Sequence, residues 1–148
     1  MTDSCLRRSA IESVATAYRH ELEEYLDFRS NPHTIIGWCR KASMELATRL
    51  DTAGFTAIAI GTSYMHVPDS YPDLFRETFE HTEHFLDDFD GTWMHWVVLA
   101  DGWVVDVTSD QFHLGEPDSA RADPVVVVEL GDTRYSLGCE GSQPAFSM

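Results

Sequence analysis

The sequence feature that most constrains the fold is the pair Asp101-Gly102, which stands between two apolar runs. The runs are Trp93 to Leu99 and Trp103 to Val107. An Asp-Gly pair in this setting favours a two-residue type I′ turn, because both central positions of that turn require a positive φ. The sequence therefore predicts an antiparallel β-hairpin in which Ala100 faces Trp103.

A turn of this length also decides which side chains of the hairpin meet. Val98 then faces Val105, and Val97 faces Asp106. Because side chains two apart along a strand share a face, His95 and Asp106 point the same way and are diagonal neighbours. A slip of one residue would place them on opposite faces. The pattern predicts a hydrogen bond between His95 and Asp106, either as an orienting acid for a histidine base or as a satisfied polar pair in a sheet.

A second feature is a cysteine at the start of a helical pattern. Apolar or small residues recur with a helical period at Cys39, Ala42, Ser43, Leu46, Ala47 and Leu50. This periodicity predicts a helix from Cys39 to about Asp51, with the thiol in its first turn and facing inward. Unpaired amides and the positive end of the helix dipole favour a thiolate there, so Cys39 is a candidate nucleophile. Buried cysteine is also common as a small hydrophobic residue, which is the alternative.

The two features together predict a catalytic triad. If the helix packs against the hairpin, Cys39, His95 and Asp106 come together. His95 would accept the thiol proton and later protonate the leaving group, while Asp106 would hold the imidazole in the required tautomer. The thiolate would attack a carbonyl carbon, and this chemistry requires no cofactor.

The same residues resemble the transglutaminase-like superfamily. Gly37-Trp38-Cys39, Ala53-Gly54-Phe55 and Gly61 resemble its cysteine segment. His95-Trp96-Val97-Val98, Asp101-Gly102-Trp103 and Asp106-Val107-Thr108 resemble its histidine and aspartate segments, in the same order. The resemblance covers residues 37–61 and 93–112. Where the family often has proline after its aspartate, this chain has Val107.

The resemblance implies an α+β fold with a papain-like core, in which the helix of Cys39 packs on an antiparallel sheet that carries His95 and Asp106. Members of the superfamily include proteases, amidases, deamidases and acyl transferases. From the length of 148 residues we expect a protein without the extra domains of animal transglutaminases, and therefore hydrolysis of an amide or peptide bond in a protein or peptide substrate. Acyl transfer by the same triad, and a non-catalytic protein-binding module on this fold, remain alternatives.

Composition limits the partners and the compartment that we expect. The length suits one domain over residues 1–148, and the net charge of −15 disfavours nucleic acid and anionic membranes. No apolar run approaches the roughly 20 residues of a membrane span, and the N-terminus lacks the apolar stretch of a secretory signal. Three cysteines without a paired spacing, Cys5, Cys39 and Cys139, are typical of reduced thiols. We therefore expect a cytoplasmic protein.

The rest of the chain predicts further elements around this centre. Helical spacing favours a helix over about residues 10–28, and apolar runs favour strands over residues 55–60, 125–128 and 133–137, the last two joined by a turn at Gly131-Asp132. Residues of about 62–92 are interpreted as an acidic insertion between two core strands, with a short helix, which covers or rims the site and is dispensable for the core fold. Glu77, His81 and His84 within it share a helix face, but we expect a solvated acidic helix there and no metal.

Overall fold

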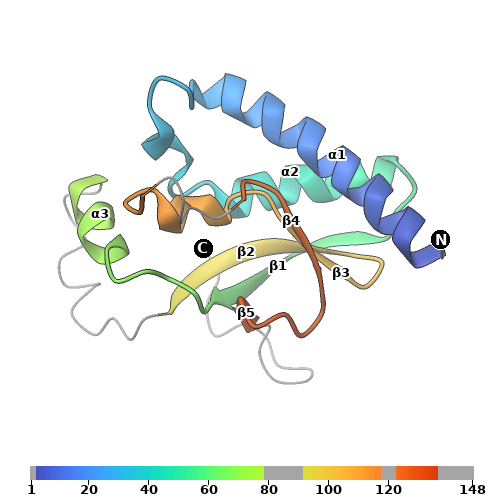
Figure 1. Ribbon diagram of the computed structural model, residues 1–148. Helices are drawn as coiled ribbons and strands as arrows, with labels where there is room; N and C mark the ends of the chain where they lie inside the picture. Colours follow the sequence, from blue (N-terminus) through green and yellow to red (C-terminus); the bar gives the residue numbers. More distant parts are fainter. Residues whose placement is uncertain (1–2, 79–91, 118–122, 137–148) are drawn as a thin grey trace.

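The sheet is built around the hairpin. In the computed structural model, which describes residues 3–78, 92–117 and 123–136, five antiparallel strands have the order β4-β3-β2-β1-β5. Their bounds are β1 Ala57–Tyr64, β2 Trp93–Ala100, β3 Trp103–Asp106, β4 Val126–Glu129 and β5 Tyr135–Ser136. The sheet curls into a half-barrel, and the fold is α+β as predicted (Figure 1).

The hairpin between β2 and β3 has the predicted turn and register. Asp101 and Gly102 have φ values of 50° and 89°, as a type I′ turn requires. Ala100 pairs with Trp103, and Val98 pairs with Val105. This register confirms that the turn has two residues, and it sets the face to which each side chain of β2 and β3 belongs.

The described residues form three α-helices, α1 Asp3–Leu26, α2 Cys39–Thr52 and α3 Tyr71–Thr78, with short 3-10 helices at Pro32–Ile35 (η1) and Ser109–His113 (η3). Helices α1 and α2 lie on the same side of the sheet (Figure 1). Helix α2 packs against β1 and β2, whereas α1 packs against α2, β3 and β4. Helix α2 therefore lies over the strand that carries His95.

The buried face of α2 is the face that the sequence predicts. Its buried residues are Cys39, Ala42, Ser43, Leu46, Ala47 and Leu50. The helix begins at Cys39, and the chain leaves it through Gly54, whose φ of 100° suits a residue just past a helix end. The helical period thus gives both the start of α2 and the inward direction of the thiol.

Three predicted elements differ from the structure. Helix α1 begins at Asp3 rather than near residue 10. Strand β1 continues through Gly61, which pairs with Trp96, because a glycine inside a ladder can keep its backbone hydrogen bonds. The segment after Gly131-Asp132 does not turn back along β4. It crosses to the opposite edge of the sheet, where Tyr135 of β5 pairs with Tyr64 of β1.

The predicted acidic insertion begins within the core of the fold rather than outside it. Residues 62–64 belong to β1, and Tyr71 and Leu74 of α3 are buried in the hydrophobic core. The first part of this segment is therefore not peripheral. His81 and His84 of the metal alternative lie outside the described residues.

The described residues contain neither a cluster of metal-ligand side chains nor a membrane-spanning helix. In residues 3–78, 92–117 and 123–136, no three histidine, cysteine or acidic side chains are grouped as metal ligands would be. No described helix is both long enough and apolar enough to cross a membrane.

Candidate active site

His95 and Asp106 form the hydrogen bond that the hairpin register predicts. The Nε2 atom of His95 lies 2.8 Å from Oδ2 of Asp106, and both side chains are buried. The carboxylate also accepts hydrogen bonds from the backbone N–H of Thr108 at 3.0 Å and from the hydroxyl of Tyr135 at 2.8 Å. The first of these donors lies just after β3, and the second is supplied by β5 from the far edge of the sheet. The carboxylate is therefore held by three separate donors.

This pairing favours the charged forms of both groups. Burial lowers the pKa of His95, but the charge and the hydrogen bond of Asp106 outweigh burial and raise that pKa to about 10. Burial acts in the opposite direction on Asp106, whose pKa is nevertheless held below its ordinary value by His95, Thr108 and Tyr135. At neutral pH the site therefore contains an imidazolium beside a carboxylate.

The structure places Cys39 on the other side of the imidazole. The thiol is 2% exposed at the first residue of α2, and the influence of Cys39 is among the causes that raise the pKa of His95. Asp106 is bonded to Nε2, and Nδ1 is buried with no hydrogen-bonding partner among the described residues, so Nδ1 is the ring nitrogen left available to the sulfur. The three predicted residues thus come together in the order thiol, imidazole, carboxylate.

Aromatic side chains fix the imidazole ring in place. The rings of Phe112 and Tyr64 meet His95 edge to face, with centroid distances of 5.0 and 5.7 Å. Tyr64 is stacked on Phe112 at 4.6 Å, and its hydroxyl is hydrogen-bonded to Nε2 of His113 at 2.8 Å. These contacts restrict the ring of His95 to one orientation and keep water away from it.

A buried ion pair anchors the segment that carries Phe112, and the sequence analysis missed it. Arg19 of α1 is 1% exposed and makes two hydrogen bonds to the carboxylate of Asp110, at 2.8 and 2.7 Å. It also donates to the carbonyl oxygen of Val107 at 2.6 Å. One signal in the sequence indicates that Arg19 is buried. It follows Ala15 by four residues and so lies on the apolar face of α1.

Gln111 links the turn before Cys39 to the segment that follows Asp106. Its side-chain oxygen accepts a hydrogen bond from the backbone N–H of Gly37 at 3.1 Å, and its side-chain nitrogen donates to the carbonyl oxygen of Thr108 at 3.0 Å. Gly37 has a φ of 89°, a conformation that disfavours other residues. The turn that leads into Cys39 is therefore tied to the segment that follows Asp106.

A tyrosine of α3 reaches the same site. Tyr71 is buried, its hydroxyl has no hydrogen-bonding partner among the described residues, and its ring lies 4.9 Å from that of Phe112, measured between centroids. Burial and the charge of Cys39 both raise the pKa of Tyr71, which places its hydroxyl near the sulfur. Because Cys39, His95 and Asp106 are all buried, the site is closed in this structure.

The geometry defines a buried Cys-His-Asp site on an α+β fold. Comparisons with known proteins found no significant match to a protein-family model, to a curated protein or to a solved structure. The resemblance to the transglutaminase-like superfamily therefore stays a prediction from short motifs, and the role of the three residues is argued from their chemistry alone.

Proposed function

We propose that this protein is a cysteine-dependent hydrolase of amide or peptide bonds, with a papain-like core of the transglutaminase-like type. The observation that supports the proposal best is the position of His95 between two partners. Its Nε2 is bonded to Asp106 at 2.8 Å, and its buried Nδ1 is the ring nitrogen left available to Cys39, which influences the pKa of His95 from the start of a helix. A nucleophile, a base and an orienting acid in this order are what nucleophilic catalysis requires.

In the proposed reaction, His95 shuttles one proton. Imidazolium beside Cys39 favours the nucleophilic thiolate, which attacks the carbonyl carbon of the substrate and forms a carbon–sulfur bond. His95 then gives its proton to the leaving nitrogen as the carbon–nitrogen bond breaks, so that an amine departs and a thioester remains. Water, deprotonated by His95, then attacks the carbonyl carbon of the thioester. The carbon–sulfur bond breaks, the carboxylic acid is released, and Cys39 and His95 return to their starting state. Asp106 keeps its negative charge throughout.

Two donors are available for the oxyanion of the tetrahedral intermediate. The backbone N–H of Cys39 belongs to the first turn of α2, where amides have no partner within the helix. The hydroxyl of Tyr71 is buried without a partner near the sulfur. Both could donate to an oxygen that becomes negative next to Cys39. Because Cys39 is buried, substrate entry requires a movement of the residues that cover it.

The experiment that tests this proposal follows the fate of the acyl group. A peptide mixture is incubated with the protein in water enriched in ¹⁸O, with and without an added primary amine, and the products are identified by mass spectrometry. Hydrolysis places one ¹⁸O in each new carboxylate, whereas acyl transfer attaches the amine instead. The Cys39→Ala variant is the control, since a methyl group fills most of the space of the thiol.

Labelled carboxylates that form with the wild-type protein and not with the control would support a hydrolase. Amine adducts as the main product would replace hydrolysis by acyl transfer. Equal products from both proteins, or no product from either, would overturn the proposal and leave a non-catalytic binding module as the better account of the fold.

A further inference from the structure

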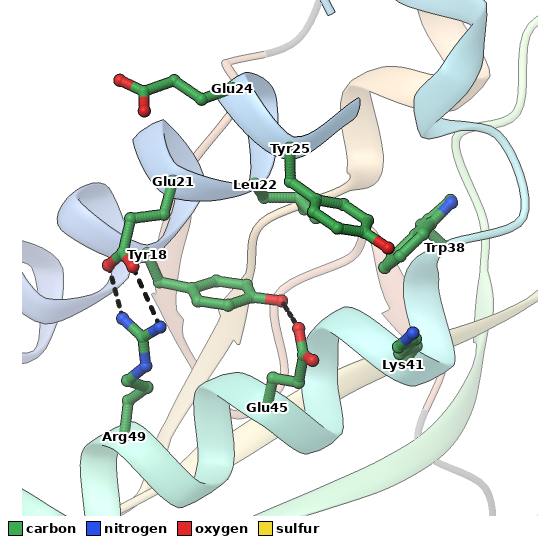
Figure 2. A pocket seen from close by; sticks show the side chains of 9 residues that line it. All are labelled: Tyr18, Glu21, Leu22, Glu24, Tyr25, Trp38, Lys41, Glu45 and Arg49. Carbon is green, nitrogen blue, oxygen red and sulfur yellow. Dashed lines mark hydrogen bonds and ion pairs between the residues drawn. The ribbon is translucent and has the colours of Figure 1, made fainter. Parts of the chain in front are cut away.

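A pocket of about 590 Å³ lies between α1 and α2, on a part of the molecule that the proposed reaction does not use (Figure 2). Cys39, His95 and Asp106 do not line it. Helix α1 contributes five of its lining residues, α2 contributes three, and the ninth is Trp38, which directly precedes α2. They are Tyr18, Glu21, Leu22, Glu24, Tyr25, Trp38, Lys41, Glu45 and Arg49.

Two aromatic rings form one end of this pocket. Tyr25 and Trp38 meet edge to face with their centroids 5.6 Å apart, and Tyr25 is 73% exposed. Figure 2 shows both rings beside the pocket, with Lys41 below Trp38. The ammonium nitrogen of Lys41 lies 4.8 Å from the centroid of the Trp38 ring. The chain therefore already places one cation on this aromatic surface, as the negative face of an indole favours.

Carboxylates line the rest of the pocket. Glu45 accepts a hydrogen bond from the hydroxyl of Tyr18 at 2.5 Å through one oxygen. Arg49 is neutralised by two hydrogen bonds to Glu21, at 2.5 and 3.1 Å. Among the described residues, Glu24 has no ion pair, and the second oxygen of Glu45 has no donor. The pocket thus offers two carboxylates against the single charge of Lys41, within a chain whose net charge is −15.

We propose that this pocket binds an arginine side chain of a basic peptide or protein. A guanidinium group stacks on aromatic rings and presents N–H donors that match a carboxylate such as Glu45. An anionic ligand would meet Glu24 and Glu45, and a neutral aromatic ligand would leave both carboxylates unused. This inference does not depend on a catalytic role for Cys39, because none of its residues belongs to the proposed triad.

The test compares two peptides that differ only in charge. Binding of acetyl-Gly-Arg-Gly-amide is measured by NMR on the full-length protein, from the shift of the Trp38 indole signal, alongside the same peptide with citrulline. Citrulline keeps the shape of arginine and lacks its charge. We expect the citrulline peptide to bind about tenfold more weakly, since it loses both the cation–π contact and the ion pair.

Variants then locate the site. Tyr25→Leu is expected to weaken binding of the arginine peptide about twofold to fivefold, the loss that one exposed cation–π contact gives. Glu45→Gln should have a similar effect, and its amide oxygen can still accept the hydrogen bond of Tyr18. Glu129→Gln on β4 removes the same charge from an exposed residue elsewhere and should leave the affinity unchanged.

Three results would overturn the inference. Equal binding of the arginine and citrulline peptides would show that charge is not recognised. Equal weakening by Glu129→Gln and Glu45→Gln would show attraction to the acidic surface as a whole. An unchanged affinity of Tyr25→Leu for the arginine peptide would show that the ring of Tyr25 does not take part in binding.

Discussion

The substitution Asp106→Asn tests the electrostatics of the site most fully, because each oxygen of the carboxylate has an identified hydrogen-bond donor. Oδ2 accepts from Nε2 of His95 and from the hydroxyl of Tyr135, whereas Oδ1 accepts from the backbone N–H of Thr108. An asparagine can keep two of these three hydrogen bonds if its oxygen takes the place of Oδ2. Its amide nitrogen then faces the N–H of Thr108, and two donors oppose each other.

The expected cost follows from this one unsatisfied pair. A buried donor that loses its partner costs about 1–3 kcal/mol. In a domain of this length, a loss of about 2 kcal/mol lowers the melting temperature by roughly 4–8 °C. The fold should therefore survive. The larger change is in the pKa of His95. Without the negative charge of Asp106, burial is the strongest influence on the ring, and burial lowers this pKa.

The assay is an NMR titration of the His95 ring in a Cys39→Ala background, with and without Asp106→Asn. With Asp106 present, we expect His95 to stay charged through neutral pH, since the charge and the hydrogen bond of Asp106 are the main causes that raise its pKa. In the protein that also carries Asp106→Asn, the pKa of His95 should fall below the ordinary value of 6.5. Equal pKa values of His95 in the two proteins would refute the reasoning that Asp106 controls its charge.

Three further predictions concern stability. Arg19→Met should cost about 3–5 kcal/mol in urea unfolding because it leaves Asp110 buried without its partner, and adding Asp110→Asn should recover part of that loss. Tyr71→Phe should leave the unfolding free energy unchanged or raise it, since the hydroxyl has no partner, and a fall of more than about 1 kcal/mol would contradict this. The stabilisation that the pairing of His95 with Asp106 contributes should be complete near pH 5–6. It should be lost as the pH rises from 6.5 to about 10, and also as the pH falls through the lowered pKa of Asp106. Urea unfolding of the wild-type protein and Asp106→Asn across this range checks this prediction, and a difference that is independent of pH would contradict it.

The hairpin and the cysteine helix were predictable because short-range rules fix them. A two-residue turn at Asp101-Gly102 determines the register, and the register decides that His95 and Asp106 share a face. The helical period of α2 likewise determines that Cys39 points inward. These features depend on residues that are close in the sequence.

The features that the sequence analysis missed depend on pairings between distant segments. Tyr135 reaches Asp106 because β5 pairs with β1 at the far edge of the sheet, and nothing near Tyr135 in the sequence specifies that partner. Arg19 enters the core only because Asp110 lies opposite it. The burial of Tyr71 reverses the expectation for a segment whose composition is acidic, since composition does not show which residues of a short helix face inward.

The central claim is that His95 activates Cys39, and the alkylation of the two described cysteines tests it most directly. Cys5 is exposed and Cys39 is buried, so exposure alone predicts that iodoacetamide modifies Cys5 faster. Activation by His95 predicts the opposite order at about pH 7, where an unperturbed thiol is mostly protonated. The rates are measured by mass spectrometry of each peptide, and His95→Gln should return Cys39 to the slower rate. Slower alkylation of Cys39 than of Cys5 in the wild-type protein, or an unchanged rate in His95→Gln, would contradict the account.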